Sequence, residues 1–249
     1  MKPLSALSFV ALGLVASGCV VSATATDGPP LTGAAQSGSL GLAKFQYACD
    51  SSTLVCAQDG NAAAFPSYIA TGARFKLTGR YDGESPATAL VLSPIARELV
   101  STDPDGTLVA LQAGWGGVEL KKRGAGETVD FAMFRIATPS KMVFFSTYGS
   151  STTSPVTGAQ SWKMSELGSR LTVSQRTLVQ AIFRSSGGES LAGEVPVDFK
   201  VADPSIVDVS SLARGRVELT PRKKGTTEIS AEGGGIKATL AIEVTGGAS

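Results

Sequence analysis

The second half of the chain alternates between apolar and polar positions with the period of a β-strand. In residues 195–201, VPVDFKV, every odd position is apolar and every even position is not, as in a strand with one buried face. Residues 177–183, 216–219, 226–231 and 238–244 behave similarly. Glycine-rich or charged turns separate these segments, so the sequence predicts about seven short strands in roughly a hundred residues. Such a set is typical of a β-sandwich.

Two places interrupt this pattern. Pro196 cannot donate a hydrogen bond to a strand ladder, so it predicts an edge strand or a bulge. In residues 95–100, IARELV, the run ARELV favours a helix. We predict a strand there instead, because the matching segment 205–210, SIVDVS, is rich in β-branched residues.

The first half of the chain repeats the second at a spacing of roughly a hundred residues, which is the length of a domain. The matches, in order, pair residues 43–47 with 140–144, 72–77 with 168–173, 91–94 with 201–204, Gly114 with Gly225, and 132–136 with 240–244. Proline at 139 cannot continue a ladder, so a boundary is expected there. We predict two autonomous domains, residues 41–138 and 139–246.

The second copy also resembles a known family. DPSIVDV (203–209), GTTEISA (225–231) and the final alternating strand (238–244) resemble a bacterial immunoglobulin-like domain of the group 2 type. The resemblance extends more loosely to the first copy, where Trp115-Gly116-Gly117 replaces GTT. It implies an all-β fold of two tandem immunoglobulin-like β-sandwich domains, used as a spacer, adhesin or assembly module.

The N-terminal residues predict export. An apolar run from Leu4 to Val15 follows Lys2 and has the length of a signal-peptide core. It leads into Ala16-Ser17-Gly18-Cys19, which resembles a bacterial lipobox and implies that residues 1–18 are removed and Cys19 is lipidated. Cleavage after Ala23 is the alternative, and it would give a secreted protein.

The predicted location follows from this N-terminus. Residues 19–40 are small and polar and have no periodicity, so we expect a flexible tether after the signal peptide. The expected location is the bacterial cell envelope, with the lipid held in the outer membrane on its periplasmic or surface side.

The chain contains three cysteines, an odd count for an exported protein. If Cys19 carries lipid, Cys49 and Cys56 remain as a pair in an oxidising compartment, and we predict a disulfide between them. Closing this short loop stabilises a domain by roughly 2–3 kcal/mol. A metal site at this pair would need further ligands, and the chain has no histidine to supply one.

The absence of histidine also restricts catalysis. Ser–His–Asp and Cys–His mechanisms, HExxH zinc chemistry and most transition-metal sites all require that residue. The nucleophile-elbow, P-loop and dinucleotide-binding motifs are missing from the sequence as well. We predict no catalytic, cofactor or metal site. With a formal net charge of only +1, the protein has no strong positive electrostatic field that would attract nucleic acid, so no nucleic-acid partner is expected.

Several local patterns admit a functional and a structural interpretation. Asp103-Pro104-Asp105-Gly106 could bind calcium, but a β-turn explains it as well and the distal glutamate is missing. The basic triplets at 121–123 and 222–224 are expected to be solvated hairpin tips. Trp115 and Trp162 could stack on a sugar, although packing against the sandwich core is the commoner role.

We therefore predict a non-catalytic lipoprotein acting as a structural, adhesive or assembly module. Its expected contacts are the membrane, through the N-terminal lipid, and a protein or glycan partner in the envelope. The alternative is a surface lipoprotein that binds or hydrolyses carbohydrate, with Glu189 and Glu194 as an acid–base pair. Both glutamates fall in SSGGESLAGE, a polar hairpin that we expect to be exposed.

Overall fold

The computed structural model describes residues 35–48, 65–81, 90–153, 160–213 and 215–246. Every regular element in these ranges is a β-strand, and the strands form four sheets. No helix in this part of the chain is long and apolar enough to cross a membrane. The signal peptide, Cys19 and the Cys49–Cys56 pair lie outside the described residues, and they stay predictions.

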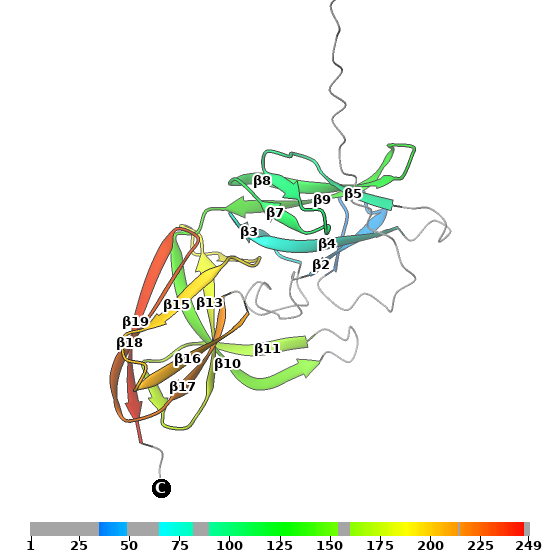
Figure 1. Ribbon diagram of the computed structural model, residues 1–249. Helices are drawn as coiled ribbons and strands as arrows, with labels where there is room; N and C mark the ends of the chain where they lie inside the picture. The colour runs from blue at the N-terminus through cyan, green and yellow to red at the C-terminus, as the bar shows by residue number, and fades with distance from the viewer. Residues whose placement is uncertain (1–34, 49–64, 82–89, 154–159, 214, 247–249) are drawn as a thin grey trace, which may run out of the picture.

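The first sandwich is built from β1 to β9 (Figure 1). One sheet has the order β1-β2-β4-β7-β6. Its strands are Ala35–Ser37, Ala43–Ala48, Arg74–Tyr81, Leu108–Ala110 and Val100–Thr102. The facing sheet has the order β3-β9-β8-β5. Its strands are Tyr68–Ala70, Thr128–Ala137, Gly114–Lys122 and Leu90–Pro94.

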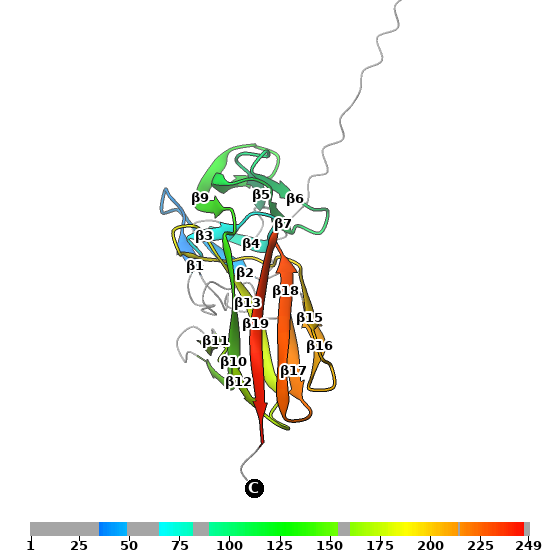
Figure 2. The ribbon, with the colours of Figure 1, turned by 90° about the vertical axis from the view of Figure 1, so that its left-hand side faces the viewer.

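The second sandwich is built from β10 to β19, and Figure 2 shows several of its strands running side by side along the molecule. One sheet has the order β11-β10-β13-β17-β16, with β14 also paired to β13. Its strands are Gln160–Glu166, Lys141–Thr153, Thr177–Arg184, Arg216–Pro221 and Val207–Ala213, with β14 at Ser190–Leu191. The other sheet has the order β12-β19-β18-β15. Its strands are Arg170–Thr172, Ile236–Thr245, Gly225–Gly233 and Val197–Val201.

Both sandwiches have the strand order of an immunoglobulin domain. The sheet β2-β4-β7-β6 matches β10-β13-β17-β16, and β9-β8-β5 matches β19-β18-β15. These are the four-stranded and three-stranded sheets of a constant-type immunoglobulin fold. In each domain a short extra strand, β3 or β12, pairs in parallel with the last strand. The prediction of two tandem immunoglobulin-like sandwiches is confirmed.

The two cores differ in character. In the first domain Phe45, Phe75 and Phe134 are fully buried, and the rings of Phe75 and Phe134 meet edge to face at 5.5 Å. In the second domain the most deeply buried residues are aliphatic, namely Val179, Leu219, Ile229 and Ile242, and Phe144 and Phe183 are slightly less buried. The alternating apolar positions of the predicted strands therefore face inward.

The strand pairing tests the register of the repeat. Gly114 and Gly225 correspond as predicted, with φ angles of +156° and +152°. Gly72, however, corresponds to Ser174, because each follows the short parallel strand with a positive φ, +80° or +69°. The predicted match of 72–77 with 168–173 was six residues out. The match of 91–94 was three residues out, because Pro94 pairs with Val118 as Val201 pairs with Ile229.

The prediction of a strand over residues 95–100 was wrong. The N–H groups of Leu99 and Val100 both donate to the Ala96 carbonyl, at 3.1 and 3.0 Å, and strand β6 begins only at Val100. Ile206 and Val207 make the same turn on Asp203. The turn is needed because β5 and β6 lie in opposite sheets, so the chain must cross between them here.

A segment of the second domain is hydrogen-bonded into the first. Ala192 accepts from Ala70 N–H and donates to Tyr68 C=O, both at 2.9 Å. Glu194 and Arg74 exchange a second pair of backbone hydrogen bonds, at 2.8 and 2.9 Å. Gly193, between them, has a φ of +100°. We call residues 191–195 the joint segment.

The joint segment corrects the expectation of an exposed hairpin. The Glu194 side chain is only 2% exposed, and Leu191, Ala192 and Val195 are buried as well. These three apolar residues interrupt the polar hairpin sequence and pack in one hydrophobic cluster with residues of both domains. Their burial against the first domain takes Glu194 out of solvent.

Candidate interaction surface

The outer face of the β3-β9-β8-β5 sheet carries two exposed apolar side chains, Trp115 and Ile95, beside the half-buried Tyr68, Phe131 and Met133. On β8 and β9 the inward positions are buried, so the alternate positions face outward. Trp115 is the most exposed of these side chains, at 66%. We call this surface the Trp115 face, and it comprises Tyr68, Ile95, Trp115, Phe131, Met133 and Arg135.

Three of these residues form a row across three neighbouring strands. Tyr68 on β3 is paired in register with Arg135 on β9, and Arg135 is paired with Trp115 on β8. The Arg135 guanidinium lies 5.9 Å from the centre of the Tyr68 ring, a cation–π contact. The stacked position limits the freedom of the Arg135 side chain, which stands next to the exposed indole.

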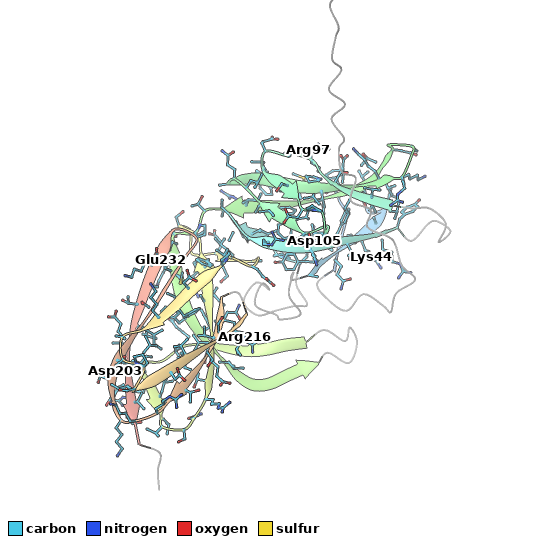
Figure 3. The ribbon with its side chains drawn as sticks, in the orientation of Figure 1. Lys44, Arg97, Asp105, Asp203, Arg216 and Glu232 are labelled. Atoms are coloured by element: carbon cyan, nitrogen blue, oxygen red, sulfur yellow. The ribbon has the colours of Figure 1, made fainter. Side chains whose placement is uncertain are left out.

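A second apolar row lies beside the first. Gly117 on β8 is paired with Met133 on β9. A methyl group added at Gly117 would lie 2.5 Å from the Met133 sulfur and 3.0 Å from the Ile95 Cδ1 atom. Met133 and Ile95 therefore close over the glycine, and Ile95 remains 47% exposed. Figure 3 labels Arg97, from the same turn as Ile95, on the side of the domain opposite Lys44.

The second domain presents a different surface on the same scaffold. From the shared pairing of β8 with β9 and of β18 with β19, Trp115 corresponds to Thr226 and Met133 to Ala241. Arg170 and Glu243 stand where Tyr68 and Arg135 stand, and they form an ion pair at 3.0 Å. The immunoglobulin fold itself therefore does not require an apolar outer face at these positions.

The expectation that Trp115 packs in the core was wrong. The inward position next to it is Gly116, where a methyl group would lie 2.8 Å from Ile136 and 3.0 Å from Phe134. Because the core leaves no room for a side chain at 116, the large residue at 115 projects outward. Trp162 belongs to β11, and its side chain lies outside the described residues.

The Asp103–Gly106 segment forms a tight turn. Asp103 N–H donates to Thr107 C=O at 2.8 Å, and Gly106 N–H donates to Asp103 C=O at 2.9 Å. Arg74 forms an ion pair with the Asp103 carboxylate at 2.5 Å. The described residues contain no group of three or more Asp, Glu, His or Cys placed to hold a metal ion. The β-turn interpretation accounts for this motif.

The basic triplets lie at strand ends beside acidic residues. Lys121 contacts Glu119 at 2.5 Å, and Lys122 contacts Glu127 at 3.8 Å. In the second domain Arg222 contacts Asp208 at 2.5 Å. These contacts support the solvated-tip interpretation.

The two glutamates of the hydrolase hypothesis have different environments. The Glu189 side chain accepts a hydrogen bond from the Ser185 hydroxyl, which lowers its pKa, and the positive charge of Arg135 adds to the effect. Glu194 is buried in the joint, where a substrate has no access. The burial of Glu194 argues against the acid–base pair of the hydrolase hypothesis. Arg135 of the Trp115 face lies near the second domain, because its strand neighbour Tyr68 accepts a backbone hydrogen bond from Ala192.

No family model and no curated protein sequence matches the chain. Among solved structures it is similar to the S-layer protein SbsC, residues 31–844, with 14% identity, a TM-score of 0.31, and coverage of 70% of this chain and 24% of that one. It is similar to invasin, a bacterial integrin-binding protein, with 10% identity, a TM-score of 0.30, and coverage of 87% and 42%. It is also similar to the Yersinia pseudotuberculosis adhesin InvE, with 12% identity, a TM-score of 0.30, and coverage of 72% of this chain and 56% of that one.

This chain spans less than two thirds of each of these three structures. Identities and TM-scores of this size give no information on function. The assignment of the fold therefore rests on the strand order of the chain itself.

Proposed function

We propose that this protein is a non-catalytic lipoprotein of the bacterial cell envelope that presents the Trp115 face to a partner. The observation that carries the proposal is the contrast between the two domains. Equivalent positions hold Trp115 and Met133 in one domain and Thr226 and Ala241 in the other. An exposed apolar surface has a solubility cost, and its presence in one of two equivalent domains points to binding.

The composition of the face favours a protein partner. Its outward residues are Tyr, Trp, Phe, Met, Arg and Ile, and the first five are the types enriched in protein–protein interfaces. Trp, Tyr and Arg in particular dominate binding energy at such interfaces. The cation–π contact orders Arg135 before binding, which lowers the entropy cost of using it.

A glycan partner is the second candidate. An indole ring that is 66% exposed, as in Trp115, can stack on the apolar face of a sugar. A sugar site also needs several polar groups that bond to hydroxyls; Arg135 offers one beside the indole, whereas Met133 and Ile95 flank the neighbouring glycine. The glycan alternative is therefore the weaker one.

The location in this proposal comes from the predicted lipidation of Cys19 and the tether that follows it. If Cys19 is lipidated, Cys19→Ala should release the protein from the membrane fraction, as measured by detergent partitioning of cell extracts. Retention of the variant in the detergent phase would contradict lipid anchoring.

Site-specific photocrosslinking in intact cells tests the function of the face. A photoreactive residue is placed at position 115 in one strain and at position 226, the equivalent site of the second domain, in a matched control. We expect discrete protein adducts from position 115 that are absent from position 226 and reduced by Met133→Ala. Identical adduct patterns at both positions would contradict the proposal, and adducts with glycan alone would favour the second candidate.

A further inference from the structure

We propose that the turn from Gly38 to Ala43 is a membrane-contact element, which inserts Leu40 and Leu42 into the lipid surface to which the N-terminus is attached. This inference rests on the lipid anchoring in the proposed function. It concerns a part of the first domain distinct from the Trp115 row.

The turn exposes two large apolar side chains. Leu40 is 57% exposed and Leu42 is 50% exposed, and they lie two residues apart in GSLGLA. Among the described residues they are two of six exposed large apolar side chains, and they lie in one turn. Single exposed leucines are ordinary on protein surfaces, so the case depends on how the turn is built.

The backbone of this turn is saturated with hydrogen bonds inside the protein. The N–H groups of Leu40, Leu42 and Ala43 donate to the Asp130 carboxylate, each at 2.8 Å. Ser39 N–H donates to Phe131 C=O at 2.8 Å. Gly38 and Gly41 N–H donate within the turn, at 2.8 and 3.0 Å. All six N–H groups from 38 to 43 thus have acceptors.

The pairing of these N–H groups lowers the cost of entering a lipid interface. A backbone N–H group that leaves water without a partner is penalised by several kcal/mol in hydrocarbon. In this turn each donor is already paired, and the anionic partner, Asp130, is fully buried beneath it. The turn therefore presents apolar side chains on a backbone that loses little by desolvation of its donors.

The turn also lies where the chain enters the first domain. Fifteen residues, 20–34, lie between Cys19 and strand β1, which begins at Ala35. If this segment is the flexible tether that the sequence predicts, its average span is roughly 20–25 Å. A lipid on Cys19 would hold the turn within reach of the membrane surface, so even a weak intrinsic affinity would produce contact through the high local concentration.

Vesicle flotation with unacylated protein tests this inference. The chain from residue 20 onward, which keeps every described residue, is mixed with phosphatidylcholine vesicles, and with vesicles that also contain phosphatidylglycerol. We expect weak flotation with both, and a loss of about tenfold or more in the bound fraction for Leu40→Ser/Leu42→Ser, because apolar burial drives the contact. Flotation that requires phosphatidylglycerol would overturn the proposal in favour of charge attraction.

Two controls keep this result separate from folding and from the proposed function. Leu212→Ser removes another exposed leucine, 52% exposed, and should leave flotation unchanged. Trp115→Thr should also leave it unchanged, whether or not the Trp115 face binds a partner. Melting temperatures of all variants should agree. Equal flotation of the double variant, no flotation of the wild type, or leucine-dependent self-association without vesicle binding would each overturn the proposal.

Discussion

Asp130 is a carboxylate at a position where the fold would ordinarily place an apolar side chain. The equivalent residue in the second domain is Ala238. Burial by itself raises the pKa of Asp130, but hydrogen bonds from the N–H groups of Leu40, Ala43, Phe131 and Leu42 outweigh it and leave the pKa below the usual 3.8. The carboxylate is thus a structural anchor for the turn at 38–43.

This anchor predicts a specific pH dependence of stability. The pKa of Asp130 is lower in the folded state than in the unfolded chain, so the unfolded state takes up the proton first as the pH falls. The stabilisation is complete above about pH 4 and is lost as the pH falls through the folded-state pKa. Asp130→Asn should cost about 1–3 kcal/mol near pH 7, because an amide cannot accept all these hydrogen bonds.

Thermal unfolding of wild type and Asp130→Asn between pH 2 and pH 7 measures this effect. The difference in melting temperature should shrink below about pH 4. A difference that is constant across the range would show that Asp130 is not ionised in its anchoring role.

Gly193 is the residue on which the joint depends. Its φ is +100°, and a methyl group there would lie 2.4 Å from the Ala73 Cβ atom of the first domain. Gly193→Ala should therefore lower stability by about 1–3 kcal/mol, through strain and through the collision across the joint.

Gly188→Ala is the matched control for Gly193→Ala. Gly188 has a similar φ of +89°, but a methyl group there would meet nothing within 4 Å. It isolates the strain, and its unfolding free energy should fall by less in the same denaturant titration. Equal losses for the two variants would argue against a tight joint.

At the scale of elements, strands β8 and β9 each have an inner and an outer side. Trp115→Thr and Met133→Ala give the outer side the residues of the second domain, and each should change the unfolding free energy by less than about 1 kcal/mol. Gly116→Ala should cost more, because its methyl group would lie 2.8 Å from Ile136. Gly168→Ala, with open space around it, is the control. Chemical denaturation measures all four, and a larger loss for Trp115→Thr than for Gly116→Ala would reverse the assigned sides.

The sequence predicted most of the strands and few of their partners. Alternation at 197–201 and 238–244 identified the strands because one face of each is half-buried or buried and the other is exposed. The predicted alignment of the two copies was wrong at Gly72. Its structural counterpart is Ser174, and a positive φ at a serine cannot be predicted from the residue type. The turn at 95–99 was not predicted, because the need to cross between the sheets comes from the whole sandwich and cannot be read from the residues ARELV.

Most of the Trp115 face could not be predicted from the sequence, because it too depends on the tertiary structure. Trp115 was visible as a candidate, but its exposure depends on the space at Gly116, which the core determines. Met133 and Ile95 come from separate segments, and only the pairing of β8 with β9 brings them to one glycine. Asp130 gave no signal, because its partners are backbone groups about 90 residues earlier in the chain.

At the scale of the whole molecule, the two domains are attached at two points. The first is the short link between β9, which ends at Ala137, and β10, which begins at Lys141. The second is the joint segment with its four backbone hydrogen bonds. A fragment of residues 139–246 keeps the core of the second sandwich, so it should still unfold in one cooperative transition.

That fragment should be less stable than the same domain in the full chain. Without the first domain, Leu191, Ala192 and Val195 lose their burial at the joint. Calorimetry should show a melting temperature several degrees lower, and a dye that binds exposed apolar surface should fluoresce more with the fragment. An unchanged melting temperature would mean that the joint contributes little.

The double attachment has a consequence for how a large partner would bind. Two sandwiches on a free linker would lose rotational entropy when one partner touched both, and that loss would weaken the complex. In this molecule the loss has already occurred during folding, because the joint fixes the mutual orientation of the domains. A partner that spans Trp115 and the neighbouring surface near Glu189 would therefore meet a preorganised template, and its affinity would depend on the quality of the contacts alone.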